Sequence, residues 1–254
     1  VYVRLGNAAV PASDAAIRAM IKETDGDSFE DMRSLEQSLT FSYAQAEFEK
    51  RDLGFADTQK KNLGLINEDG LYTNLGLLLS DQCMHTTKVA VFQSPDKSDF
   101  RDRKEFAGSL LQPLAETFEY INIYNRTSAH FEGLLRIDRP DYPEVAIRET
   151  LLNAYVHREY SFSGSTLVNI FTDRIEIVSL GGLVPGLSIE AVKPGVSQSR
   201  NVKLANVFSR LKLIEAYGNG ISKTISSNDG AHAQPDIKAR DGACVAVLTN
   251  RNEP

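Results

Sequence analysis

Hydrophobic residues recur with a helical period between positions 143 and 158. Glu149, Asn153 and His157 follow one another at intervals of four, so they share one face about a turn apart. Pro143 suits the first helical position, where its missing N–H costs nothing. We predict a helix over 143–158 whose opposite, apolar arc is made by Val145, Ile147, Leu151, Leu152, Ala154 and Tyr155.

The polar face of this helix allows two interpretations. It is an ordinary solvated face, as in most amphipathic helices, or it is a binding face. Ala146 and Thr150 are the small neighbours of Glu149 and Asn153, and small neighbours leave room for a ligand.

Alternation of apolar and polar residues predicts strands after this helix. Residues 165–171 are β-rich and turn at 172–174 into the alternating run 175–180. This order predicts an antiparallel hairpin with one face packed on the helix. We further predict an amphipathic helix over 202–217 and a closing hairpin over 235–250.

Helices and a turn are predicted before residue 85. The helices lie over 40–54, with Thr40 as N-cap, and over 57–65. A strand–turn–strand signal follows over 65–73, and then an apolar helix over 74–82.

Helix, helix and hairpin is the order of a winged-helix unit. Either its second helix, which carries Lys60, Lys61 and Asn62, reads DNA, or the segment connects and packs the module that follows. Mixed charge and a chiefly apolar second part favour the connecting role.

Four further elements complete the predicted order. The segment 85–94 has the pattern of a buried strand, and 103–123 that of a long helix that Pro113 should either kink or restart. A strand is predicted over 131–140, and a short helix near the start of the chain over 14–22.

Composition narrows the class of protein. The 254 residues allow one large or two smaller domains. A net charge of −6 and a pI near 5.3 argue against a general nucleic-acid binder, because phosphates are neutralised by clustered Lys and Arg. Cys83 and Cys244 indicate neither a metal site nor a disulfide framework. This use of cysteine suits a reducing cytoplasm. His85 and His130 lack partners at metal-ligand spacing. No apolar run approaches the roughly 18 residues of a membrane span.

A carboxylate followed four residues later by Asn on a helix resembles the N-box of the GHKL ATPases. Four blocks then occur in order: YPEVAIRETLLNAYVHREYS, DRIEIVSLGGL, SRNVKLANVF and IEAYGNGI. They resemble the C-terminal module of bacterial transcriptional regulators often labelled ATP-dependent DNA helicase RecG-related. The resemblance implies an α+β fold with a GHKL-like, Bergerat-type helix layer on a mixed sheet, preceded by a small helical, winged-helix-like subdomain.

The resemblance implies roles for the N-box face. In the GHKL superfamily the acid activates the attacking water and the Asn holds Mg²⁺, so these roles fall to Glu149 and Asn153. His157 either positions the Glu or the water, or caps the helix. The expected cofactors are ATP and Mg²⁺.

The resemblance implies an adenine site in the loop after the predicted strand 175–180, with one departure from the superfamily. Where D-x-G-x-G supplies an Asp for the adenine amino group, this chain has Ser179, which accepts a hydrogen bond but offers no carboxylate. Gly181 matches a required glycine, whereas Gly182 is displaced from the second.

Two more segments match the regulator group. Arg200 and Asn201 correspond to its Arg-Asn pair; Arg200 either faces phosphate oxygens or forms a structural ion pair with Glu149 or another carboxylate. Gly218 and Gly220 precede a predicted helix and either cradle phosphate with backbone N–H groups or mark only a helix stop and turn.

The resemblance also suggests three parts. YVRLGNAAVPAS resembles the end of a Schlafen/AlbA-type DNA-binding domain, so 1–12 is expected to be the tail of a truncated domain of that type. The connector is expected over 13–82 and the GHKL-like domain over 83–254. The first residue is Val1, which we interpret as the start of a fragment of a longer protein.

Three functions compete at this stage. The leading one is a cytoplasmic transcriptional regulator with a Mg²⁺-dependent nucleotide-binding module and weak ATPase activity. The second is a catalytically inert dimerisation and signal-relay module, and a homodimer is the expected assembly. The third is DNA binding, by the winged-helix-like segment or the absent N-terminal domain. No G-x-x-x-x-G-K-[ST] occurs, so a helicase motor is not supported.

Overall fold

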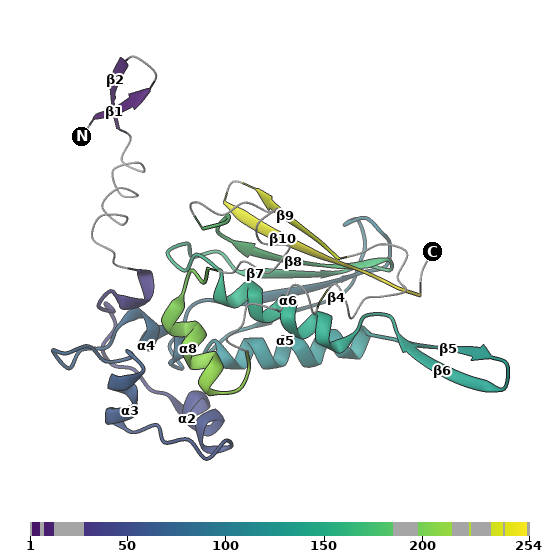
Figure 1. Cartoon of the computed structure of the whole chain (residues 1–254), viewed down its shortest axis with the longest axis horizontal. Coiled ribbons are helices and arrows are strands. Elements are labelled where there is room, and N and C mark those ends of the chain that lie inside the picture. The colour runs from purple at the N-terminus through teal and green to yellow at the C-terminus, as the bar shows by residue number, and fades with distance from the viewer. Residues whose placement is uncertain are drawn as a thin grey trace.

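A six-stranded sheet forms the centre of the computed structural model (Figure 1). The structure describes residues 2–5, 8–12, 28–184, 198–214, 224, 235–240 and 242–252. The strand order is β4-β3-β7-β8-β10-β9. The strands are β3 (Thr87–Phe92), β4 (Phe100–Phe106), β7 (Thr166–Ile170), β8 (Arg174–Leu180), β9 (Asp236–Arg240) and β10 (Ala243–Thr249).

The sheet is mixed. β3 and β7 pair in parallel, and every other neighbouring pair is antiparallel. The two predicted hairpins are present as β7–β8 and β9–β10. The α+β class with a helix layer on a mixed sheet is therefore confirmed.

Two helices, α5 (Leu111–Tyr124) and α6 (Glu144–Val156), lie side by side on one face of the sheet (Figure 1). β8 shows why they pack there: Ile175, Ile177 and Ser179 alternate with half-exposed residues and are all buried. A third helix, α8 (Val202–Arg210), contacts α6.

The predicted N-box helix is confirmed with one correction. Pro143 is the N-cap, with an extended ψ of 131°, and the helix begins at Glu144. Proline at the first helical position is therefore wrong by one residue.

The predicted helix over 103–123 is wrong in its first part. Phe100–Phe106 is an edge strand that pairs with β3, and the helix begins only at Leu111. Pro113 is the third helical residue, where the N–H has no intrahelical partner to lose. It therefore needs no kink.

The predicted strand over 131–140 is a hairpin of two strands, β5 (Thr127–Glu132) and β6 (Leu135–Pro140). Gly133, with a φ of +63°, supplies the left-handed turn residue. The hairpin forms its own sheet and projects past the ends of α5 and α6 (Figure 1).

The helical segment before the sheet contains α2 (Ser42–Glu49), α3 (Asp57–Asn62) and α4 (Asn74–Leu79). Thr40 is not the N-cap of α2, because Phe41 holds that position and the Asp81 carboxylate accepts from the backbone N–H of Ser42 and Tyr43 at 2.8 and 3.3 Å. The second helix is likewise shorter than 57–65.

The predicted strand–turn–strand over 65–73 is a tight turn closed by one bridge between Ile66 and Tyr72. Two more short elements precede the helical segment, namely the hairpin β1 (Tyr2–Leu5) with β2 (Ala8–Pro11) and the 3₁₀ turn η1 (Phe29–Asp31). The predicted helix 14–22 lies outside the described residues.

One hydrophobic core joins the helical segment to the sheet. Phe48 and Leu75 belong to the same buried cluster as Val89, Ile147 and Phe208. Among the described residues, no helix combines the length and apolar character needed to cross a membrane.

Candidate functional site

The face of α6 that carries the N-box residues is covered rather than solvated. Glu149 is 9% exposed, and its small neighbours Ala146 and Thr150 are 1% and 6% exposed. Burying a carboxylate costs free energy unless the group is paired. Glu149 therefore needs a partner, which a carboxylate on a solvated face would not.

Arg148 provides the partner of Glu149. One guanidinium nitrogen donates to the Glu149 carboxylate, and another donates to the carbonyl oxygen of Leu213. Arg148 therefore links Glu149 to Leu213, which follows α8 and precedes Gly218 and Gly220 in the sequence. Gly218 and Gly220 themselves lie outside the described residues.

Asn153, one turn further along α6, is half-buried. Within the described part of the chain, nothing forms a hydrogen bond with its carboxamide, whereas its backbone carbonyl accepts from the His157 N–H at 3.0 Å. The described residues therefore leave its amide oxygen open to another group.

His157 is the C-cap of α6, with φ and ψ of −97° and 0°, so it occupies the capping position considered for it. Burial, helped by the positive charge of Arg200, lowers the pKa of its imidazole below the ordinary value. The ring is therefore a neutral hydrogen-bonding group at neutral pH.

Ser179 and Gly181 lie where β8 ends beside the end of α6. The Glu159 N–H donates to the Leu180 carbonyl at 2.8 Å, which aligns the two ends. Ser179 is 4% exposed and faces the helix layer. Gly181 has a φ of +99°, and a Cβ there would lie 2.8 Å from the Cβ of Glu159, so both the backbone conformation and the packing require glycine.

Arg200 is engaged with protein groups. Its guanidinium donates to the Glu159 carboxylate at 3.1 Å and to the carbonyls of His157 and Gly182 at 3.1 and 2.8 Å. Of the two alternatives predicted for Arg200, the structure has the structural ion pair, and its partner is Glu159 rather than Glu149.

Asn201 is 2% exposed and holds the end of α6. Its amide donates to the carbonyls of Val156 and Arg158, both at 2.8 Å. Val156 is the last residue of α6, and Arg158 directly follows the C-cap His157. Carbonyls at a helix end lack intrahelical partners, so Asn201 acts as a C-terminal cap.

Sequence reasoning missed Arg158. The residue is 1% exposed, and among the described residues no carboxylate pairs with it. It donates to the Thr166 hydroxyl at 2.8 Å and to the Gly164 carbonyl, and it lies 3.3 Å from Nδ1 of His85. The HREY run contained this residue but gave no sign that the side chain would be buried.

The His85 ring also packs edge-on against Tyr160 at 5.1 Å and Phe29 at 6.4 Å. Among the described residues, no group of His, Cys, Asp and Glu side chains is arranged so that it could hold a metal ion. Burial and the charge of Arg158 lower the pKa of His85 to about 4.

This shift predicts a pH dependence of stability. Between pH 6.5 and 4 the unfolded chain binds a proton at His85 that the folded chain does not bind, so stability falls as pH falls. Because the ring is partly exposed, we expect a loss of about 2 kcal/mol rather than the full value of the shift. Urea unfolding of wild type and His85→Gln at pH 7 and pH 4.5 measures it. The variant should lose less stability on acidification; equal losses would contradict the assignment.

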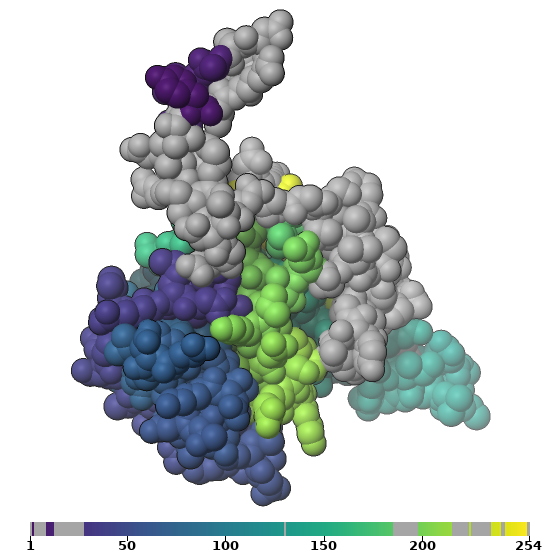
Figure 2. Space-filling model, turned by 60° about the vertical axis from the view of Figure 1, so that its left-hand side comes forward, coloured from purple at the N-terminus to yellow at the C-terminus, as the bar shows by residue number. Residues whose placement is uncertain are grey.

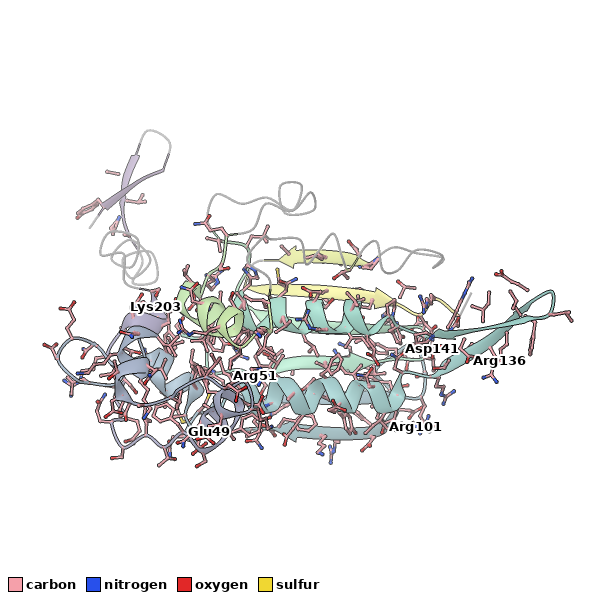
Figure 3. The ribbon with its side chains drawn as sticks, turned by 60° about the horizontal axis from the view of Figure 1, so that its bottom comes forward. Glu49, Arg51, Arg101, Arg136, Asp141 and Lys203 are labelled. Carbon is pink, nitrogen blue, oxygen red and sulfur yellow. The ribbon has the colours of Figure 1, made fainter. Side chains whose placement is uncertain are left out.

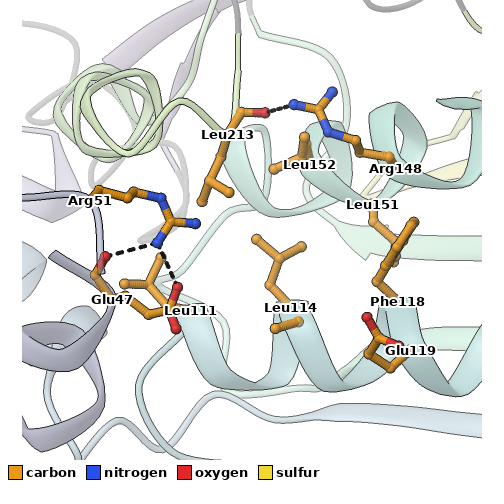
Figure 4. Close-up of a pocket in the computed structure, with 11 residues that line it drawn as sticks. Glu47, Arg51, Leu111, Leu114, Phe118, Glu119, Arg148, Leu151, Leu152 and Leu213 are labelled. Carbon is orange, nitrogen blue, oxygen red and sulfur yellow. Dashed lines mark hydrogen bonds and ion pairs between the residues drawn. The ribbon is translucent and has the colours of Figure 1, made fainter. Parts of the chain in front are cut away.

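A groove of about 220 Å³ lies between α2, α5 and α6 (Figure 4). Glu47, Arg51, Glu119 and Arg148 form its charged rim. Its volume is below the roughly 300–1,000 Å³ of small-molecule pockets, and neither Asn153 nor Ser179 lines it. We do not assign the nucleotide to it. Its walls are mainly apolar and include Leu111, Leu114, Phe118, Leu151, Leu152 and Leu213.

Comparison with known proteins finds one family model that matches the last third of the chain. Residues 165–248 match a family model described as "Putative ATP-dependent DNA helicase recG C-terminal". This part of the chain is similar to the RecG-related ATPase-like module. The matched residues include Ser179, Gly181, Arg200 and Asn201 but begin after α6, so the roles of Glu149 and Asn153 rest on the N-box pattern and on the geometry above.

No curated protein matches the chain by sequence. The solved structures that match include the crystal structure of the DIP2311 protein from Corynebacterium diphtheriae, with a TM-score of 0.76 at 19% sequence identity. The match covers 99% of this chain and 53% of that one, so this chain spans about half the length of that protein. At this identity the likeness establishes the fold alone.

Proposed function

We propose that the chain is part of a transcriptional regulator whose ATPase-like module binds a nucleotide together with Mg²⁺. The observation that carries this proposal is the half-buried Asn153 carboxamide, which lacks a partner in the described part of the chain, one turn from the buried carboxylate of Glu149. Arg148 pairs with the Glu149 carboxylate, and the described residues leave the Asn153 carboxamide open to a ligand.

The donor set fits the ion. Mg²⁺ prefers oxygen ligands and is usually held by one or two protein groups together with substrate phosphates and water. The amide oxygen of Asn153 is such a ligand, and bound Mg²⁺ would neutralise the phosphate charge. Arg148 fixes the Glu149 carboxylate beside it, so the acid is oriented to accept a proton from water. Ser179 can accept one hydrogen bond at the base-binding end.

Glu149→Gln separates binding from hydrolysis. We expect the variant to bind Mg-ATP within about threefold of wild type and to hydrolyse it 10²–10⁴-fold more slowly, because an amide cannot accept the proton. A phosphate-release assay and a nucleotide titration measure the two quantities. The matched control is Glu144→Gln, an exposed acid in the first turn of α6. Equal hydrolysis by wild type and Glu149→Gln would remove the general-base role.

A module without catalysis is the second candidate, and two observations favour it. Ser179 cannot supply the carboxylate of the adenine site, and Arg200 and Asn201 are committed to protein carbonyls and Glu159. In that case the module serves homodimerisation and signal relay, and the titration above shows no binding.

We assign DNA contact to the part of the regulator that precedes the helical connector. Lys60 on α3 lies 3.3 Å from Asp57 and over the rings of Phe41 and Phe55, at 5.1 and 5.4 Å. A lysine engaged in this way is poorly placed for a phosphate, which favours the connecting role for α2–α4.

A further inference from the structure

The start of α8 is capped by a residue from far upstream. Both carboxylate oxygens of Glu30 accept hydrogen bonds from the first turn of α8, from the Lys203 N–H at 2.7 Å and the Leu204 N–H at 2.9 Å. Glu30 is 1% exposed. The helix's own N-cap residue, Asn201, makes no side-chain cap bond, so Glu30 supplies the acceptors that a helix N-terminus requires.

Asp31 strengthens the same contact by pairing with the Lys203 ammonium group. Figure 2 shows the green residues of α8 lying against the blue-violet residues of the segment that begins with η1, and Figure 3 places Lys203 where α8 meets η1. Glu30 and Asp31 therefore hold backbone and side chain of one helical turn.

The turn that carries Glu30 is itself fixed to the helical connector. The Asn74 side chain donates to the Phe29 carbonyl at 3.0 Å, and the Asn74 N–H donates to the Met32 carbonyl at 2.8 Å. A bridge between Arg33 and Thr73 continues this attachment. These contacts therefore attach Glu30 to the connector.

On its other side, the start of α8 holds the end of the N-box helix. Arg200 and Asn201 immediately precede α8 and bind the carbonyls of Val156, His157 and Arg158. The chain of contacts runs from the connector through Glu30 to α8, and from there to the end of α6.

We propose that Glu30 is a positioning residue that couples the connector segment 28–34 to the N-box site. While Glu30 caps α8, Arg200 and Asn201 hold the last turn of α6 in place, and with it Asn153 and His157. Withdrawal of Glu30 releases this turn and weakens the nucleotide site; this effect on nucleotide rests on the proposed function. The coupling gives the connector control over ligand affinity.

Glu30→Gln is the informative change because it preserves size while removing the charge and one of the two acceptors. The matched control is Glu36→Gln, the same chemical change six residues further on at an exposed position. Both variants are made in the full chain.

Amide hydrogen exchange tests the coupling without nucleotide. In Glu30→Gln we expect about tenfold faster exchange at Lys203 and Leu204, and also at the His157 and Glu159 amides near the end of α6. Exchange in β10 should equal that of wild type and of Glu36→Gln. Acceleration confined to α8, or spread evenly through β10, would overturn the proposal.

A titration with Mg-ATP provides the second readout. We expect Glu30→Gln to bind about tenfold more weakly than wild type and Glu36→Gln, and unchanged affinity would contradict the coupling. If wild type binds no nucleotide, the proposed function fails, and the exchange result alone decides whether Glu30 positions the end of α6.

Discussion

Replacing Asn201 with alanine is expected to lower the free energy of unfolding by about 3 kcal/mol. Its amide group donates to the Val156 and Arg158 carbonyls, and both contacts are buried. Alanine leaves these two carbonyls without a partner in a place with little access to water, and each unmet acceptor costs about 1–3 kcal/mol.

Equilibrium urea unfolding measures this loss from the midpoint and slope of the transition. Asn62→Ala, at an exposed position on α3, is the control and should change stability by at most about 0.5 kcal/mol. A loss below about 1 kcal/mol for Asn201→Ala would mean that water or another donor replaces the cap.

Replacing Asn153 with alanine is expected to weaken Mg-nucleotide binding by about 100-fold while leaving stability almost unchanged. Its side chain has no hydrogen-bond partner in the described part of the chain, so the folded state loses no contact of that kind. Alanine is also the better helix former, by a few tenths of a kcal/mol. The effects on function and on folding should therefore separate.

Isothermal titration with Mg-ATP and urea unfolding of the same sample test this separation. Asn122→Ala, a half-buried position on α5, is the control and should bind like wild type. Equal affinities for wild type and Asn153→Ala would exclude Asn153 from the site, whereas a large loss of stability would show that the residue serves the fold.

The pattern of apolar and polar residues predicted the helices and strands that have one buried and one more exposed face. β8 alternates Ile175, Ile177 and Ser179 inward, which is the periodicity visible in the sequence. β4 was mistaken for helix because only Phe106 of its seven residues is buried, so no alternation marks it as a strand. Pro113 did not reveal where the helix begins. In the sequence, a proline in the middle of a helix looks the same as a proline in its first turn.

Contacts between distant residues lay beyond the sequence. Asp81 caps α2 and Glu30 caps α8 from 39 or more positions away, and no local rule pairs them. The choice of Glu159 as the partner of Arg200 also depends on how β8 and α6 end together. The i, i+4 spacing did place Glu149 and Asn153 on one face of α6, but their chemistry stays a prediction.

The most direct measurement is thermal unfolding of the wild-type chain with Mg-ATP or Mg-ADP, with the same nucleotide in EDTA, and with neither. A ligand at about 100 times its dissociation constant adds roughly 2.7 kcal/mol, which raises the midpoint by roughly 5–10 °C in a chain of this size. We predict this rise with Mg²⁺ and its loss in EDTA. An unchanged midpoint with adenine and guanine nucleotides alike, at millimolar concentration, would contradict nucleotide binding by this module.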